Sequence, residues 1–170
     1  MKKWKSIMLL VFLVIIDQVT KFWAKLTLEG KDPFVIIKDV FCFQYLEGGN
    51  TGAAFGLFQG KIGLLSLSSL IVFLLLIFVI FKMPKEKKYN LLELTVTVLA
   101  AGAMGNLIDR VMHNYVIDFM YFNLIDFPIF NVADCYVVIS AIALFLLFVF
   151  YYKEEDLNFL SRKQKLPNEK

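Results

Sequence analysis

The stretch LLELTVTVLAAGAMGNLIDRV, residues 91–111, decides the fold of this chain. Its 21 residues are enough for an α-helix to cross about 30 Å of hydrocarbon. A small residue such as Gly105 would let a neighbouring helix approach closely. Asn106, Asp109 and Arg110 lie three or four positions apart, so they share a helical face that must meet protein or water. The stretch therefore predicts a membrane helix that packs against other parts of the protein.

The rest of the chain is also strongly apolar. Hydrophobic residues make up 59% of the 170 residues, and the mean hydropathy is +0.67, which excludes an ordinary soluble domain. We expect a single all-α membrane domain over residues 1–170, built as a four-transmembrane-helix bundle. The expected helices cover residues 7–28, 62–81, 91–111 and 133–152.

The basic residues predict the orientation of this bundle. Twelve of the eighteen lysines and arginines fall in three clusters, which are Lys2, Lys3 and Lys5, then Lys82, Lys85, Lys87 and Lys88, then Lys153, Arg162, Lys163, Lys165 and Lys170. Because such clusters stay on the cytoplasmic side, we expect both termini and the tail 153–170 to be cytoplasmic. Residues 29–61 and 112–132 then face the opposite side. The net charge of +3 reflects this topology and does not indicate nucleic-acid binding.

The first outer segment has the composition of a small sheet. Residues 34–46, FVIIKDVFCFQYL, are rich in β-branched and aromatic residues and predict two or three short strands. A turn at Gly48, Gly49 and Asn50 follows. Because an open sheet edge cannot lie in hydrocarbon, we expect an extracytoplasmic β-platform at the membrane interface, which could support a peptide.

Several acids lie in or beside the apolar segments. Asp17 and Lys21 are four apart, which predicts an ion pair on one helical face. Asn131 and Asp134 are three residues apart, which is the spacing of an N-cap residue and the N3 residue of a capping box. Asp118 lies among apolar neighbours, and it could be a loop acid in water. Alternatively, two carboxylates that share a proton can activate a water molecule for attack on a peptide carbonyl, with no cofactor or metal.

The cysteines and the histidine offer little support for other catalytic centres. Cys42 and Cys135 do not have a metal-ligand spacing, and His113 is the single histidine. We expect two free thiols, although a disulfide is possible in an oxidising compartment.

Two alternatives to an enzyme are open at this point. A small membrane transporter or proton channel could relay ions through intramembrane charges such as Asp17, Lys21 and Asp109. However, residues 62–81 offer only serines, and the fourth apolar stretch is almost free of polar groups after Asp134. The second alternative is a non-catalytic membrane assembly subunit, in which the acids serve as caps and ion pairs.

Five motifs occur in a characteristic order between residues 17 and 134. They are DQVTK at 17–21, NTGAAFG at 50–56, GAMGNLIDR at 102–110, VIDF at 116–119 and FNVAD at 130–134. Together they closely resemble the bacterial lipoprotein signal peptidases. There are mild departures, since Asn114 and Ser140 stand where that family often has glycine, and asparagine tolerates a positive φ at such a position.

The resemblance implies an intramembrane-type aspartic endopeptidase. Its catalytic pair would be Asp118 and Asp134, and positions that line or support the site would be Asp17, Lys21, Asn50, Gly102, Asn106, Asp109, Arg110, Asn131 and Ala133. The implied substrates are diacylglyceryl-modified prolipoproteins, cleaved before the lipidated cysteine at the extracytoplasmic side of the bacterial cytoplasmic membrane. Membrane lipid and globomycin-like inhibitors are the other implied partners. We expect a monomer.

Overall fold

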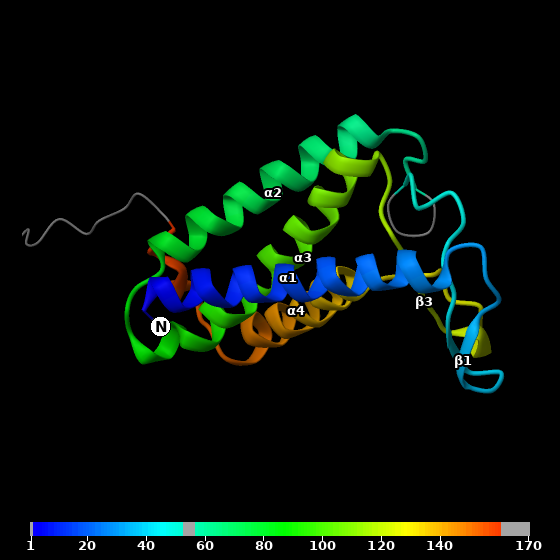
Figure 1. The fold of residues 1–170 in the computed structure, drawn as a ribbon. Helices are drawn as coiled ribbons and strands as arrows, with labels where there is room; N and C mark the ends of the chain where they lie inside the picture. Colours follow the sequence, from blue (N-terminus) through cyan, green and yellow to red (C-terminus); the bar gives the residue numbers. More distant parts are fainter. Residues whose placement is uncertain (1, 53–56, 161–170) are drawn as a thin grey trace, which may run out of the picture.

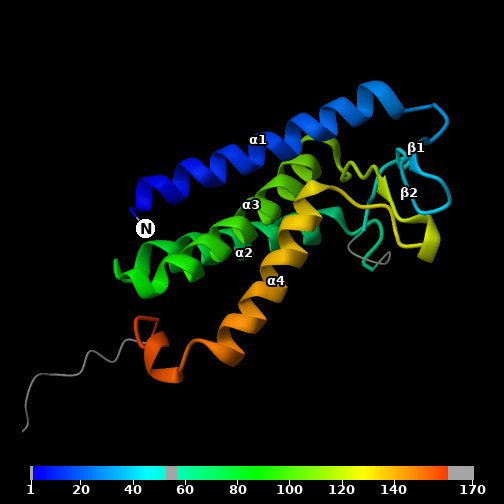
Figure 2. The same ribbon diagram turned by 90° about the horizontal axis from the view of Figure 1, so that it is seen from below.

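The computed structural model describes residues 2–52 and 57–160, and within them it has four long helices and a small sheet (Figures 1 and 2). The helices are α1, Lys3–Leu28; α2, Ile62–Lys82; α3, Asn90–His113; and α4, Val132–Phe150. Each is long and apolar enough to cross a membrane. They lie close to the expected stretches, although α1 begins four residues earlier and α4 ends two residues earlier. Residues 53–56 of the second motif and 161–170 of the expected tail lie outside the described residues.

Helix α3 is the central helix of the bundle. It packs against α1, α2 and α4, whereas α1 touches α2 and α4 much less. In the most apolar 18-residue stretch of each helix, 56% of the residues are buried for α3 and 11% for α2. The mean hydropathy of the same stretch is nevertheless lower for α3, at 1.7, than for α2, at 3.0. Lipid favours the apolar faces of the outer helices, so the helix with the most polar groups is the one enclosed by protein.

Small residues on α3 allow α4 and α1 to come close. A Cβ atom added at Gly102 would lie 2.7 Å from the carbonyl oxygen of Ala133 and 2.8 Å from a methyl group of Val137. A Cβ atom at Gly105 would lie 2.4 Å from a carboxylate oxygen of Asp17. The close helix approach expected from these glycines is therefore confirmed.

The sheet joins the two connections at one end of the bundle. Its strands are β1, Phe34–Ile37; β2, Phe41–Phe43; and β3, Met120–Tyr121, all antiparallel in the order β1-β2-β3 within the described chain. The strands expected in the first connection are confirmed as β1 and β2. Strand β3 belongs to the connection between α3 and α4 and was not expected from the sequence.

Pairing between the two connections continues beyond the sheet towards the end of α3. The backbone N–H of Leu46 donates to the carbonyl of Asp118 over 3.0 Å, and Asn50 exchanges backbone hydrogen bonds of 2.9 Å with Val116. These bonds set the position of Asp118 relative to Asn50. Among the described residues, short 3₁₀ helices at Lys87–Tyr89, Asn123–Ile125 and Glu154–Leu157 lie in or after the connections.

The two departures from the expected motifs have different surroundings. Asn114 ends α3 with a φ of 62°, in the left-handed region that asparagine tolerates, as expected. Ser140 is buried in α4, and its hydroxyl has no hydrogen-bond partner among the described residues. Cys42 and Cys135 are free thiols.

The contact at Gly102 leads to a stability prediction. Gly102→Ala should lower the thermal unfolding temperature in detergent, because the added methyl group meets backbone of α4, and such overpacking costs roughly 1–3 kcal/mol. Gly63→Ala is the matched control, since a Cβ atom at helical Gly63 meets nothing within 4 Å. Equal unfolding temperatures for the two variants would contradict the proposed close approach of α3 and α4.

Candidate active site

The buried ammonium group of Lys21 is the hub of a polar network at the sheet end of the bundle. The side chain is only 1% exposed. Its Nζ lies 2.9 Å from Asp17 Oδ2 and 3.0 Å from Asp109 Oδ2, and it donates to Asn106 Oδ1 over 3.0 Å. An ammonium group has three donors, so each of them has a partner. The expected Asp17–Lys21 ion pair is confirmed, and α3 supplies the two other acceptors.

Both carboxylates of this hub also accept backbone hydrogen bonds. Asp17 Oδ1 accepts from the N–H of Ala133, in the first turn of α4, over 2.9 Å. Asp109 Oδ2 accepts from the N–H of Ile117 over 3.0 Å. The network thereby fixes both the start of α4 and the residue before Asp118.

Gln18 is a member of the network that the sequence analysis missed. Its Nε2 donates to Asp17 Oδ2 over 3.1 Å and to Asp109 Oδ1 over 3.0 Å. Gln18 lies three residues before Lys21, so it shares a helical face with it. That spacing is the signal that could have identified Gln18.

Asn106 connects the hub to Asp134, one of the two candidate catalytic acids. Its Oδ1 accepts from Lys21, which leaves Nδ2 to donate to Asp134 Oδ1 over 2.8 Å. Asn131 Nδ2 also donates to Asn106 Oδ1, over 3.1 Å. Because both donors require an oxygen at that position, the orientation of the Asn106 amide is fixed by its neighbours.

Asn131 holds both candidate acids. Its Oδ1 accepts from the N–H of Asp134 over 3.0 Å, and its own N–H donates to Asp134 Oδ2 over 3.1 Å, so the expected helix cap is confirmed as a capping box. In addition, Asn131 Nδ2 donates to Asp118 Oδ1 over 2.6 Å. One asparagine therefore bonds the two carboxylates, which lie 16 positions apart in the sequence.

Asp118 is buried, being only 1% exposed, so the interpretation as a loop acid in water is wrong. Its Oδ2 accepts from Asn50 Nδ2 over 2.8 Å. Burial raises the pKa of Asp118 to about 7, and the nearby charge of Asp134 adds to this increase, while the hydrogen bonds from Asn50 and Asn131 oppose it. Asp134, in contrast, is partly exposed. The pair thus combines a fully buried acid with an acid that is partly exposed.

Arg110 does not bond either acid. Its guanidinium group donates to the carbonyl of Gly52 over 3.2 Å and to Ser69 Oγ over 3.4 Å, which ties α3 to α2 and to the loop before it. The N–H of Gly52 in turn donates to Asn50 Oδ1 over 2.9 Å. Arg110 therefore supports Asp118 through Gly52 and Asn50.

The structure brings the residues expected at the site together in distinct ways. Asp17, Lys21, Asn106, Asp109 and Asn131 form the network around Asp118 and Asp134, and Asn50 joins it through Asp118. Gly102 and Ala133 contribute close backbone packing. Among the described residues, no group of three or more His, Cys, Asp or Glu side chains could hold a metal ion.

Comparison with known proteins relates this geometry to one family. The family model described as signal peptidase (SPase) II matches residues 9–150, a span that contains every residue of the network. The lipoprotein signal peptidase of Clostridium tetani is 41% identical over 150 residues, which cover 88% of this chain and 94% of that relative. The lipoprotein signal peptidase of Clostridium novyi is 40% identical over 147 residues, covering 84% and 97%.

A solved structure agrees with this assignment. It is described as a bacterial membrane enzyme determined by the in meso method, and it superposes with a TM-score of 0.75 at 32% identity. The alignment covers 96% of this chain and 94% of that one.

The hub around Lys21 leads to a second stability prediction. Lys21→Met should strongly destabilise the protein, because Asp17 and Asp109 would stay buried without a cation, and breaking a buried pair costs roughly 3–5 kcal/mol. Lys5→Met on the same helix is the control, since Lys5 is exposed. Thermal unfolding in detergent measures both variants. A Lys21→Met protein as stable as the control would show that the network does not hold the bundle together.

Proposed function

This chain belongs to the signal peptidase II family, and on that premise we propose that Asp118 and Asp134 form its catalytic pair. As a member of that family it is an aspartic peptidase that removes signal peptides from prolipoproteins. Family membership decides against the transporter, the proton channel and the non-catalytic assembly subunit. The observation that carries the residue assignment is the position of Asn131, which donates to Asp118 and forms a capping box with Asp134.

The two acids have surroundings suited to different roles. Asp134 accepts hydrogen bonds from the Asn106 side chain and from the Asn131 N–H at the start of α4, where a helix favours negative charge. Its partial exposure gives water access to the carboxylate. Asp118 is buried and holds its proton to about pH 7. We infer that the pair shares one proton near neutral pH, and the fuller burial of Asp118 favours it as the neutral member.

This distribution of charge supports hydrolysis in two steps. Ionised Asp134 removes a proton as the water oxygen bonds to the peptide carbonyl carbon, and Asp118 donates its proton to the carbonyl oxygen. The resulting tetrahedral intermediate is neutral. Asp134 then gives its proton to the leaving nitrogen as the C–N bond breaks, and Asp118 recovers a proton from the hydroxyl group. Both carboxyl groups return to their starting states.

The substrate we propose is a diacylglyceryl-modified prolipoprotein that is cleaved before its lipidated cysteine. The start of α1, the α2–α3 connection and the 3₁₀ helix Glu154–Leu157 lie at the end of the bundle opposite the sheet (Figure 1). The lysines at the start of α1 and in the α2–α3 connection, at this end, support a cytoplasmic position for both termini in the bacterial cytoplasmic membrane. The sheet and the two acids then lie at the extracytoplasmic side.

The sheet supports a role in holding substrate at that surface. All four residues of the edge strand β1 are exposed, and all are apolar. Such a strand can rest in the outer membrane interface with the substrate lipid close to the acids. Globomycin-like inhibitors would occupy the same site, and the enzyme would act as a monomer without a cofactor.

Cleavage of a lipidated prolipoprotein by the purified protein in detergent tests the catalytic pair. Asp118→Asn and Asp134→Asn should each lower the cleavage rate by roughly 10²–10⁴-fold, because each loses one half of the proton transfer. EDTA should have no effect on the parent protein.

The control variant is Asp126→Asn, which removes an acid in the same connection whose partner is the hydroxyl group of Tyr121. It should cleave at the parent rate. Unchanged elution in size-exclusion chromatography verifies that the inactive variants are folded. Parent-level cleavage by either the Asp118 or the Asp134 variant would refute the assignment.

A further inference from the structure

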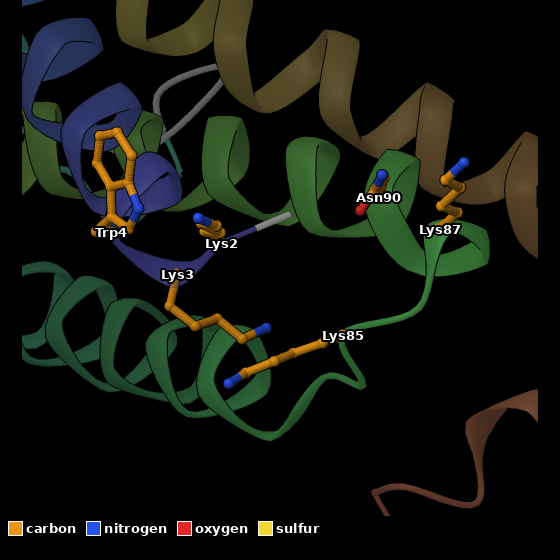
Figure 3. A pocket seen from close by; sticks show the side chains of 6 residues that line it. All are labelled: Lys2, Lys3, Trp4, Lys85, Lys87 and Asn90. Atoms are coloured by element: carbon orange, nitrogen blue, oxygen red, sulfur yellow. The ribbon is translucent and has the colours of Figure 1, made fainter.

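A basic cavity lies at the end of the bundle remote from the two acids. Its volume is about 610 Å³, and it is lined by Lys2, Lys3, Trp4, Lys85, Lys87 and Asn90 (Figure 3). These residues come from the start of α1, from the α2–α3 connection and from the start of α3. The cavity therefore lies where three separate segments meet, and the catalytic network makes no use of it.

Positive charge exceeds negative charge around this cavity. Lys3 lies 3.5 Å from the buried carboxylate of Glu93 and donates to the carbonyl of Met83, so its charge is matched within the protein. Lys2, Lys85 and Lys87 are exposed, and Glu86 is the exposed acid between the last two. Figure 3 shows the ends of Lys3 and Lys85 pointing into the same space. Since the charge of Lys3 is matched, the exposed charges of Lys2, Lys85 and Lys87 are the ones that favour an anion here.

The backbone adds to the attraction for an anion. Helix α1 begins at the cavity, with Lys2 at its N-cap position. Helix α3 instead continues from the 3₁₀ helix Lys87–Tyr89, and the N–H of Asn90 already donates to the carbonyl of Lys87. In the part of the chain that the structure describes, Lys2 makes no side-chain hydrogen bond to α1, and the first turn of α1 has no acid, whereas that of α3 has Glu93. The first N–H groups of a helix and its dipole both favour a negative group at such a position.

The flanks of the cavity are apolar. Trp4 is 53% exposed, and next to it on α1 Ile7 and Met8 are exposed as well. On α2, Phe81 is exposed beside the connection that carries Lys85. A free phosphate ion would leave these surfaces unused, whereas the acyl chains of a lipid would lie along them while its headgroup meets the lysines.

We propose that this cavity binds the phosphate group of an anionic phospholipid, with its acyl chains along the exposed faces of α1 and α2. The headgroup must be anionic in total, because the ammonium group of a zwitterionic headgroup would face the lysines. The bound lipid would anchor the start of α1 to the α2–α3 connection. This proposal does not depend on the roles of Asp118 and Asp134.

Tryptophan fluorescence gives a direct test of the proposal. Trp4 and Trp23 are the two tryptophans of the chain, so a Trp23→Phe background leaves Trp4 beside the cavity as the only emitter. The protein is placed in phosphatidylcholine vesicles with increasing fractions of brominated phosphatidylglycerol or, separately, brominated phosphatidylcholine. The ratio of the two quenching efficiencies measures the preference for the anionic lipid at Trp4.

Two variants with the same charge change separate a site from general surface attraction. Lys2→Gln/Lys85→Gln should reduce the preference for phosphatidylglycerol roughly tenfold or more, since each lysine near an anionic headgroup contributes about 1 kcal/mol. Lys5→Gln/Lys82→Gln neutralises two lysines of the same membrane end that do not line the cavity, and it should change the preference by less than about threefold.

Three results would overturn the proposal. The parent protein could show no preference for phosphatidylglycerol, or the preference could fall equally in both double variants, which would indicate diffuse attraction to the surface. In the third, inorganic phosphate at millimolar concentration would relieve the quenching by brominated phosphatidylglycerol. The cavity would then take free phosphate in place of a lipid headgroup. Unchanged helical circular dichroism in both double variants makes the comparison valid.

Discussion

The buried ammonium group of Lys21 is the constraint on which the rest of the site depends. A charge at this depth in an apolar bundle is costly unless it is fully paired, and Lys21 meets that condition with Asp17, Asp109 and Asn106. Each of these three partners also forms a hydrogen bond with another segment of the chain. Asp17 holds the first turn of α4, Asp109 holds the backbone before Asp118, and Asn106 bonds Asp134. The same interaction that neutralises one charge therefore positions both candidate catalytic acids.

The arrangement of the helices follows from this need for pairing. The helix that carries Asn106, Asp109 and Arg110 lies in the middle of the bundle, and the most apolar helix, α2, faces outward. Glycines on α3 then bring the start of α4 close enough for its capping box to join the network. The sheet adds the last component, because pairing between the two connections places Asp118 beside Asn50 and Asn131.

Local spacing in the sequence predicted those features that depend on one segment. Four apolar stretches gave the helices, a four-residue spacing gave the Asp17–Lys21 pair, and a three-residue spacing gave the capping box at Asn131. Features that join segments far apart in the sequence could not be predicted from local spacing. Strand β3, the bond from Asn131 to Asp118 and the contact of Arg110 with Gly52 all depend on tertiary packing. The choice of Asp118 and Asp134 as a pair came from the family resemblance, because spacing alone left a loop acid and a helix cap as alternatives.

The shared proton is the central claim, and infrared titration of protein labelled with ¹³C at the aspartate carboxyl groups tests it most directly. The pKa of Asp118 is raised from 3.8 to about 7, so the folded state favours the protonated carboxyl group. This protonation stabilises the fold at low pH, and the stabilisation is lost as the pH rises from 3.8 through about 7. A proton shared by the pair predicts a labelled carboxylic acid band at about pH 6 that disappears above about pH 7 and is absent in Asp118→Asn. Labelled carboxylates that are all ionised at about pH 6, or an acid band that persists in Asp118→Asn, would contradict it.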